Sequence, residues 1–367
     1  MNIQYVSSGK SPSGYGSASR ADIMALYVAG VNVSCQTIQQ TAETTDYGLE
    51  GKLMQELEGR KIPYKIKLIH LTPDIIPDYK EDGVYTISRL AWETDRLPKE
   101  WVEPLNKCDE IWTMSSQMAE MIHSSGVNTL CTVIPEPVNT MYAEEEIEPF
   151  LIPTQRDFVF YTIGQWIERK NMRGLIRAYW REFTGEQNVS LLIKTYRMNY
   201  ASDEWAKIKQ EIEVFRRELK LDHYPKILLV KSLLTEDQMW KLHAVGDVYV
   251  NPSSGEGWAR PLAEAMALGK PCISGDNGGI TDYMSTYYHV ASNEEPVIEN
   301  PHIPWYSSPQ KWKTLDEKSL QRAMRSVFTD FTMAQKKGKQ AQKFVVDNFS
   351  YQEVGSKMKK RLEEIVL

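Results

Sequence analysis

The sequence contains no apolar run long enough to cross a bilayer, and residues 1–10 lack the cationic and apolar regions of a signal peptide. From these absences we expect a cytoplasmic protein without an integral membrane segment. Cysteine is scarce, at four of 367 residues, and no two cysteines form a Cys-x-x-Cys pair. A zinc site or a disulfide framework is therefore not expected.

An excess of positive charge is also absent. Lysine and arginine number 43 against 49 aspartates and glutamates, which gives a net charge of -6. Non-specific nucleic-acid binding depends on clustered cations, so this balance argues against it. There is no short repeat and no low-complexity tract.

The sequence does contain an alternation of strand, turn and helix patterns, which predicts an α/β protein with parallel sheets covered by helices. A length of 367 residues favours two domains. The stretch 143–153 is acidic, contains two prolines and has no clean periodicity, so we expect it to link them. Two doubly wound domains in tandem place a cleft between the carboxyl ends of their sheets, where such sheets bind ligands.

The expected elements follow from apolar periodicity and from helix start and stop signals. In the first half we expect strands over 3–7, 32–37, 66–70, 84–89, 110–114 and 130–134, and helices over 19–29, 99–106 and 117–124. In the second half we expect strands over 158–163, 190–194, 227–230, 247–251, 271–274 and 289–291, and helices over 202–219, 235–246 and 261–268. Thr235 and Gln238 have the spacing of a capping box.

The most informative segment spans residues 247–282. It is predicted to be a buried strand, a Ser/Gly loop that contains Glu256, a helix that contains Glu264, a second strand and a Gly-Gly turn. A carboxylate accepts two hydrogen bonds at once, which suits the vicinal hydroxyls of a sugar or ribose. The backbone N–H groups of residues 257–262 lie near a helix N-terminus, where phosphate is favoured. Glutamates at this spacing are common by chance, so the pair is informative only because of the strand–loop–helix frame.

This segment resembles the donor-site signature of glycosyltransferase family 4, whose members are retaining enzymes of the GT-B fold. The matching residues are Pro252-Ser253, Glu256-Gly257-Trp258, Pro261, Glu264-Ala265-Met266, Gly269, Pro271 and Gly278-Gly279. The chain departs from the usual pattern at Ala259, where glycine is commoner, and at Arg260, where an apolar residue is frequent.

The resemblance covers nearly the whole chain and implies a GT-B fold, with two Rossmann-like doubly wound domains facing across a cleft. Residues 1–150 would form the acceptor-side domain and residues 151–345 the domain that binds a nucleotide-diphosphate sugar. Residues 346–367 would form a C-terminal helix that packs back toward the N-terminal domain. A plain solvent-facing helix is the alternative for this last segment.

The segment 162–171 is similar to the family turn in which an arginine and a lysine hold the donor diphosphate. Lys170 matches the lysine. Gln165 stands where an arginine usually follows Gly164, so the arginine role would fall to Arg169. An exposed helix start is the alternative, but cations are disfavoured at helix N-termini unless an anion is present.

The resemblance also implies other contacts to the donor. Lys231 and Leu233 follow a strand as the family's base-contacting loop does. Lys194 ends a strand, and a snorkelling surface lysine is the alternative for it. Gly14 and Gly16 lie between the first strand and the first helix, as in the family's glycine-rich loop. The remaining implied donor contacts are Gly257, Trp258, Arg260 and Leu262.

In the first domain, the segment 87–98 is similar to a subgroup of the family with a Trp-Glu pair. Other members carry a histidine near this position, and here Trp92 and Glu93 are the candidates. The alternative is that Glu93 forms a structural pair with Arg89 or Arg96. His70 also ends a strand at the cleft, although a satisfied core histidine is the commoner fate.

The resemblance implies catalysis by Glu256, Lys170, Arg169 and Glu93. The donor phosphates would sit between the 14–16 loop and the two cations, with Glu256 on the sugar and Glu264 on the ribose. The acceptor would attack on the face that the diphosphate leaves. The sequence has no Asp-x-Asp, the metal signature of the other large transferase fold, so neither a metal nor another cofactor is expected.

The acceptor stays open: a glycan, a lipid-linked sugar, a small molecule, a protein or a modified nucleic-acid base would all be compatible with the motifs. An epimerase or phosphorylase of the same fold, and a non-catalytic sugar-nucleotide-binding protein, are the alternatives to a transferase. A glycosidase fits less well, because its two carboxylates must flank one bond.

Overall fold

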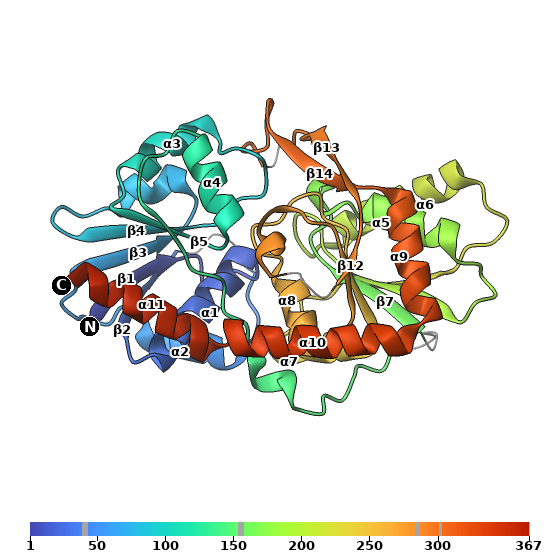
Figure 1. Ribbon diagram of the computed structural model, residues 1–367, viewed down its shortest axis with the longest axis horizontal. Helices are drawn as coiled ribbons and strands as arrows, with labels where there is room; N and C mark the ends of the chain where they lie inside the picture. Colours follow the sequence, from blue (N-terminus) through green and yellow to red (C-terminus); the bar gives the residue numbers. More distant parts are fainter. Residues whose placement is uncertain (39–42, 153–157, 284–286, 301–302, 367) are drawn as a thin grey trace.

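The computed structural model describes residues 1–38, 43–152, 158–283, 287–300 and 303–366, and it contains two parallel six-stranded sheets in tandem (Figure 1). The first has the order β2-β1-β3-β4-β5-β6 and the second β12-β11-β10-β7-β8-β9. The strands of the first sheet are β1 (Asn2–Ser7), β2 (Asn32–Thr37), β3 (Ile66–His70), β4 (Tyr85–Leu90), β5 (Glu110–Thr113) and β6 (Cys131–Val133). Those of the second are β7 (Phe158–Ile163), β8 (Val189–Lys194), β9 (Lys226–Val230), β10 (Val248–Asn251), β11 (Cys272–Ser274) and β12 (Tyr288–His289). The predicted α/β architecture with parallel sheets is confirmed.

Helices cover both faces of the first sheet, with α1, α2 and α11 on one side and α3 and α4 on the other (Figure 1). The helices of the first half are α1 (Gly14–Val28), α2 (Gly48–Leu57), α3 (Lys99–Asn106) and α4 (Ser116–Ser124). The later ones are α5 (Met172–Glu182), α6 (Ser202–Leu219), α7 (Glu236–Val245), α8 (Arg260–Ala267), α9 (Glu317–Thr329), α10 (Phe331–Phe349) and α11 (Tyr351–Val366). Helix α10 runs along the C-terminal domain, and α11 then packs along α1 of the N-terminal domain (Figure 1).

Capping side chains set several helix starts. Thr235 and Gln238 form the predicted capping box at the start of α7. Ser13 accepts a hydrogen bond from the N–H of Gly16, and this cap makes α1 begin at Gly14. The prediction of a helix over 19–29 was therefore wrong at its start, and Gly14 and Gly16 lie in the first helical turn, not in a loop.

The register of the second sheet sets up the cleft. Ile163 of β7 pairs with Lys194 of β8 at the carboxyl ends of both strands. The N–H of Gly164 donates to the Lys194 carbonyl at 3.1 Å. Because the strands are parallel, the loops that follow β7, β8 and β10 all emerge on the side that faces the first domain.

An antiparallel hairpin, β13 (Ser292–Pro296) and β14 (Lys311–Leu315), interrupts the C-terminal domain after β12. The sequence interpretation did not foresee it. The larger cluster of buried apolar side chains includes Trp92 and Trp101 from the N-terminal domain and Tyr306 and Trp312 from this excursion. The hairpin therefore joins the cores of the two domains.

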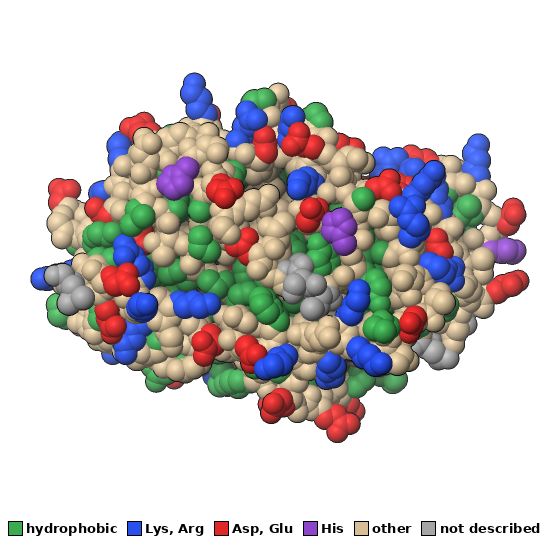
Figure 2. Space-filling model, viewed as in Figure 1, with side chains coloured by type: hydrophobic (Ala, Val, Ile, Leu, Met, Phe, Trp, Pro, Cys, Tyr) green, Lys and Arg blue, Asp and Glu red, His purple; other side chains and the backbone are tan. Residues whose placement is uncertain are grey.

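The stretch expected to link the domains has no regular helix or strand from Glu144 to Ile152, and its residue 153 lies outside the described residues. No helix in the described part of the chain is long and apolar enough to cross a bilayer. Figure 2 shows lysine, arginine, aspartate and glutamate side chains interspersed over this face of the molecule. Such mixing fits the modest net charge of -6.

Candidate active site

A cavity of about 440 Å³ lies between the two domains at the carboxyl ends of their sheets. It is lined by the loop after β1 and the start of α1, and by the loops after β4, β7, β8 and β10. Most of the predicted site residues line it, namely Gly14, Glu93, Gly164, Gln165, Arg169, Lys170, Lys194, Leu233, Glu256, Gly257, Trp258, Arg260 and Glu264. The structure thus brings residues more than 200 positions apart to one place.

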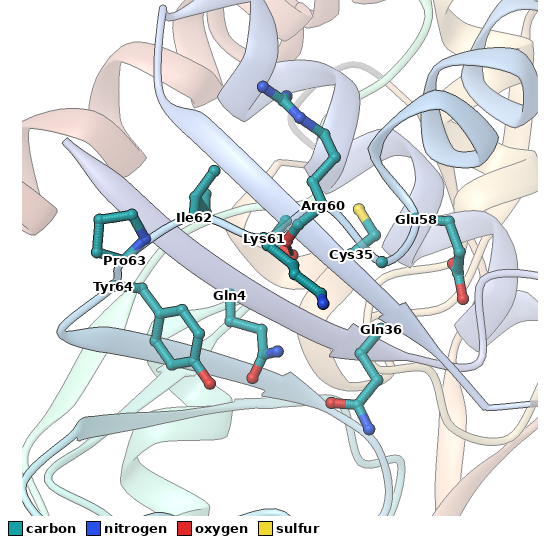
Figure 3. A pocket seen from close by; sticks show the side chains of 11 residues that line it. Gln4, Cys35, Gln36, Glu58, Arg60, Lys61, Ile62, Pro63 and Tyr64 are labelled. Atoms are coloured by element: carbon teal, nitrogen blue, oxygen red, sulfur yellow. Dashed lines mark hydrogen bonds between the residues drawn. The ribbon is translucent and has the colours of Figure 1, made fainter.

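A second hollow, of about 580 Å³, lies elsewhere on the N-terminal domain. Figure 3 shows its lining side chains, among them Gln4, Gln36 and Tyr64, on β1, β2 and the segment that leads into β3. All of its lining residues come from one domain, and none belongs to the motifs described above. The interdomain cavity is therefore the candidate site.

Four charged side chains form a cluster in the interdomain cavity, which we call the charge cluster: Glu93, Arg169, Lys170 and Glu256. Arg169 Nη1 lies 3.3 Å from Glu256 Oε2, and its Nη2 lies 3.3 Å from Glu93 Oε1. Lys170 Nζ donates to Glu256 Oε1. Two cations thus face two carboxylates, and the cluster is formally neutral.

Burial and pairing act in opposite directions on the protonation of this cluster. Burial by itself would raise the pKa of Glu256, but the charges of Lys170 and Arg169 outweigh it and hold that pKa below its usual value. The pKa of Lys170 is lowered by burial, against the attraction of Glu256. Glu256 is therefore an ionised carboxylate held by two cations.

Local backbone geometry positions the two cations. Arg169 and Lys170 lie on a short 3-10 turn, η3 (Glu168–Lys170), which Asn171 ends in the left-handed region with φ 45. The Asn171 side chain then caps α5 by accepting from the N–H of Gly174. Arg169 is 9% exposed, so the alternative of an exposed helix start is wrong.

The two domains approach each other closely at Gly255. A Cβ built on this glycine would lie 2.0 Å from the backbone oxygen of Glu93. The Gly255 carbonyl also accepts a hydrogen bond from Arg169 Nη1 at 2.6 Å. Only a residue without a side chain lets these loops meet, and their meeting places Glu93 beside Arg169.

Glu93 does not form the pairs that the sequence suggested as alternatives. Arg89 pairs with the buried Asp22 at 2.9 Å, and Arg96 pairs with its neighbour Asp95 at 2.8 Å. The partners of Glu93 are instead Arg169 and the hydroxyl of Tyr306, which donates to Glu93 Oε2 at 3.0 Å.

Lys194 is a cation without a carboxylate partner in the described part of the chain. It is 5% exposed, so the snorkelling alternative is wrong. Its Nζ donates to the hydroxyl of Tyr200 at 3.3 Å and lies 4.8 and 5.6 Å from the ring centroids of Tyr200 and Tyr196. Burial lowers the pKa of Lys194 to about 8. A buried, unpaired cation that lines a cavity is a site for an anion.

Glu264 occupies the other end of the cavity. Its Oε1 lies 3.4 Å from Arg260 Nη2, and its Oε2 lies 3.4 Å from His243 Nε2. Arg260 also donates to the Pro137 carbonyl at 3.1 Å and lies 3.5 Å from Glu136. Burial raises the pKa of Glu136 to about 7. Arg260, the departure from the family pattern, thus connects helix α8 to the segment that leaves the first domain.

Three predicted residues lie outside the cavity lining. Gly16 faces the Ser11 carbonyl, where a Cβ would be 2.1 Å away, so its lack of a side chain serves packing. Lys231 is exposed. Leu262 is fully buried, and its N–H donates to the Ala259 carbonyl at 2.9 Å, so this N–H is not available for a phosphate.

Sequence reasoning missed Tyr306, Tyr196, Tyr200 and Glu136. The cluster Trp305, Tyr306 and Trp312 was the signal available for the first of these, since aromatic residues gather in cores and sites. His70 does line the cavity, and its Nδ1 lies 2.9 Å from the Tyr5 hydroxyl. Burial lowers the pKa of His70 well below its usual value, so the ring is neutral.

With this geometry established, the chain can be compared with known proteins. Residues 157–297 match the family model of glycosyl transferases, group 1. This group 1 segment includes Arg169, Lys170, Lys194, Glu256 and Glu264. No protein with a curated description matches the chain significantly.

Several solved structures share the fold of the whole chain. Sucrose-phosphate synthase from Thermosynechococcus elongatus has a TM-score of 0.71 at 15% identity, over 100% of this chain and 99% of that one. HepE from Anabaena, in complex with UDP-glucose, has a TM-score of 0.68 at 14% identity, over 99% and 100%. A glycosyltransferase from Rickettsia africae has a TM-score of 0.65 at 13% identity, over 100% and 98%. The predicted GT-B fold is confirmed.

Proposed function

We propose that this chain is a retaining glycosyltransferase of family 4, which moves a sugar from a nucleotide-diphosphate sugar to a hydroxyl group of an acceptor. The observation that carries the proposal is the meeting of three cations, the buried Arg169 and Lys194 and the half-buried Lys170, with the carboxylate Glu256 in one interdomain cavity. The match of residues 157–297 to glycosyl transferases, group 1, supports it.

The charges of the site fit the departure of a diphosphate. As the bond between sugar and diphosphate breaks, negative charge grows on the leaving group and positive charge on the sugar. Fixed cations stabilise the first of these changes. Lys194 has no carboxylate partner among the described residues, and Lys170 is held only by Glu256, so both can turn their charge toward phosphate oxygens.

The carboxylates have separate tasks in this scheme. Glu256, freed from part of its pairing when phosphate binds the lysines, faces the developing positive charge on the sugar. Glu264 accepts hydrogen bonds from the ribose hydroxyls, since a carboxylate offers two acceptor oxygens. Arg260 and His243 fix the orientation of Glu264.

The retaining course follows from the side of attack. The acceptor hydroxyl attacks the sugar on the face that the diphosphate leaves, and a phosphate oxygen takes the acceptor proton. Atoms balance in this step: the new bond joins the acceptor oxygen to the sugar, and the proton leaves with the nucleoside diphosphate. The cations of the chain carry the charge stabilisation, so we propose that the reaction needs no metal.

UDP-glucose is the first donor to test, because the similar Anabaena structure holds it. We expect UDP and UDP-glucose, or another nucleoside diphosphate and its sugar in a panel, to raise the melting temperature of the protein. EDTA should leave this shift unchanged. The anomeric configuration of the product, followed by NMR, should equal that of the donor. No stabilisation by any member of the panel would overturn the donor site, and an inverted product would overturn the retaining course.

A further inference from the structure

The C-terminal domain sends one segment across the cleft onto the first domain. This cross-domain segment, residues 303–315, ends in β14 and leads toward α9. In Figure 1 the hairpin β13–β14 lies at the edge of the C-terminal domain that faces α3 and α4. Two hydrogen bonds join Lys311 to Asp95: the Asp95 N–H donates to the Lys311 carbonyl at 2.9 Å, and the Lys311 N–H donates to the side-chain Oδ1 of Asp95 at 2.6 Å.

Aromatic contacts seat this segment against the first domain. The ring centroid of Tyr306 lies 5.2 Å from that of Trp92, with an interplanar angle of 34°. It lies 5.8 Å from the ring centroid of Trp312, with an interplanar angle of 71°. Trp305 lies 5.4 Å from Trp101. Aromatic pairs at these separations contribute beyond their buried area, so they stabilise the contact of this segment with the first domain.

The Tyr306 hydroxyl reaches the charge cluster from this seat. It donates to Glu93 Oε2 at 3.0 Å and also contacts the guanidinium of Arg169. Tyr306 is 6% exposed. Burial raises its pKa well above the usual value, with Glu93 adding to the effect, so the hydroxyl keeps its proton as a donor.

We propose that Tyr306 is a positioning residue, which fixes the carboxylate of Glu93 and, through it, Arg169 for the reaction; this inference rests on the proposed glycosyl transfer. Arg169 alone does not define the orientation of Glu93, because the guanidinium is shared with Glu256 and with the Gly255 carbonyl. A second, neutral donor of fixed direction removes that freedom.

The proposal also ties the site to the arrangement of the domains. Glu93 comes from the first domain, whereas Arg169 and Tyr306 come from the second. The three groups meet only when the cross-domain segment is seated on Trp92 and Trp101. A domain movement that unseats it therefore disassembles the Glu93 end of the site while leaving Lys170, Lys194 and Glu256 together.

The test compares Tyr306→Phe with Trp305→Phe in the full chain. Both variants keep an aromatic ring in the cross-domain segment, but only the first removes a contact to Glu93. The assay is hydrolysis of the sugar nucleotide that most stabilises the wild type, in which water takes the sugar and nucleoside diphosphate is released. We expect Tyr306→Phe to lower kcat about ten-fold or more with donor KM changed less than two-fold, the loss expected for one hydrogen bond to a charged group. Trp305→Phe should keep kcat within about two-fold of the wild type.

A double-mutant cycle with Glu93→Ala, which removes the acceptor of the Tyr306 hydroxyl, separates positioning from a general structural effect. If Tyr306 acts through Glu93, adding Tyr306→Phe to Glu93→Ala should lower kcat little further. Losses that multiply would overturn the proposal. So would an unchanged kcat in Tyr306→Phe, or an equal loss in Trp305→Phe.

A crystal structure of Tyr306→Phe tests the inference without any turnover. The Glu93 carboxylate should rotate away from its place beside Arg169 while the backbone contact at Gly255 stays. If no sugar nucleotide stabilises the wild type, the proposed function is wrong, and this structure still decides whether Tyr306 orients Glu93. An unmoved Glu93 would overturn the positioning role.

Discussion

The carboxylate of Glu93, from the first domain, lies 3.3 Å from the guanidinium of Arg169, from the second. This cross-domain pair completes a neutral cluster whose other members, Lys170 and Glu256, belong to the second domain. A neutral cluster of paired charges stabilises the empty protein, but it must be partly undone when an anionic ligand arrives. The prediction for Glu256 rests on this exchange of partners.

Glu256→Gln should make the empty protein less stable and more responsive to ligand. The substitution keeps the shape of the side chain but leaves Glu93 as the remaining carboxylate of the cluster, which pairs with Arg169. Breaking a buried ion pair in this way costs about 3–5 kcal/mol. Turnover should fall by about two orders of magnitude or more. Urea unfolding with and without UDP should show that UDP stabilises this variant more than the wild type, because the phosphates supply the missing negative charge. An equal or smaller gain would contradict this account.

Lys194→Met should make the empty protein more stable and less responsive to ligand. Removing an unpaired buried cation relieves its desolvation, so the empty variant should unfold at higher urea concentration than the wild type. UDP should then stabilise it clearly less than it stabilises the wild type, since one of the three cations that face the phosphates is gone. Lys231→Met is the matched control, because Lys231 is exposed and lies outside the cavity lining. Equal loss of the UDP effect in both variants would point to general electrostatics and not to a site.

Comparison of the wild type with Lys194→Met also isolates the contribution of Lys194 to the pH dependence of the unfolding free energy. Its pKa is lowered from 10.5 to about 8, so between these values the unfolded chain holds the proton more often than the folded one. The unfolding free energy should therefore rise with pH across that window, by about 3 kcal/mol at most. The difference in unfolding free energy between the wild type and Lys194→Met should shrink as pH rises from 8 to 10.5. UDP binding to the wild type should weaken over the same range, because an anion favours the protonated lysine.

The raised pKa of Glu136 leads to a second pH prediction with the opposite sign: its contribution makes the unfolding free energy fall as pH rises, and it does so at lower pH. Burial raises its pKa from 4.5 to about 7, so the folded state holds the proton that the unfolded chain releases. Its contribution to stability is thus lost as pH rises from 4.5 to 7, by about 3 kcal/mol at most. Glu136→Gln keeps a hydrogen-bonding group beside Arg260 and cannot ionise. Its unfolding free energy relative to the wild type should grow across this window, and a constant difference would contradict the prediction.

Gly255→Ala should separate the domains without unfolding either one. The added methyl group would lie 2.0 Å from the backbone oxygen of Glu93, so one of the two loops must move. We expect a larger radius of gyration by small-angle X-ray scattering and at least a ten-fold loss of turnover, because the site spans both domains. Gly185→Ala is the control, since a methyl group there meets its nearest atoms at an ordinary 3.6 Å. An unchanged radius with lost turnover would show that the methyl acts locally.

The fold could be predicted because its determinants are local. The strands over 32–37 and 66–70 and the helices over 99–106 and 202–219 were expected with the bounds that the structure has. The start of the first helix was predicted too late because Ser13 lies among several serines, each of which could serve as the N-cap. The hairpin β13–β14 was missed, since its exposed strand Ser292–Pro296 carries little apolar alternation.

The sequence by itself determined the alternating strands and helices, the capping box at Thr235 and the spacing of Glu256 and Glu264, because these depend on neighbours within a few residues. Tertiary structure alone decided which charges are paired. Tyr306 meets Glu93 across 213 positions of sequence, and Lys194 lies beside two tyrosines with no carboxylate partner in the described part of the chain. Pairing and desolvation depend on which distant segments share a buried space, and no local pattern encodes that.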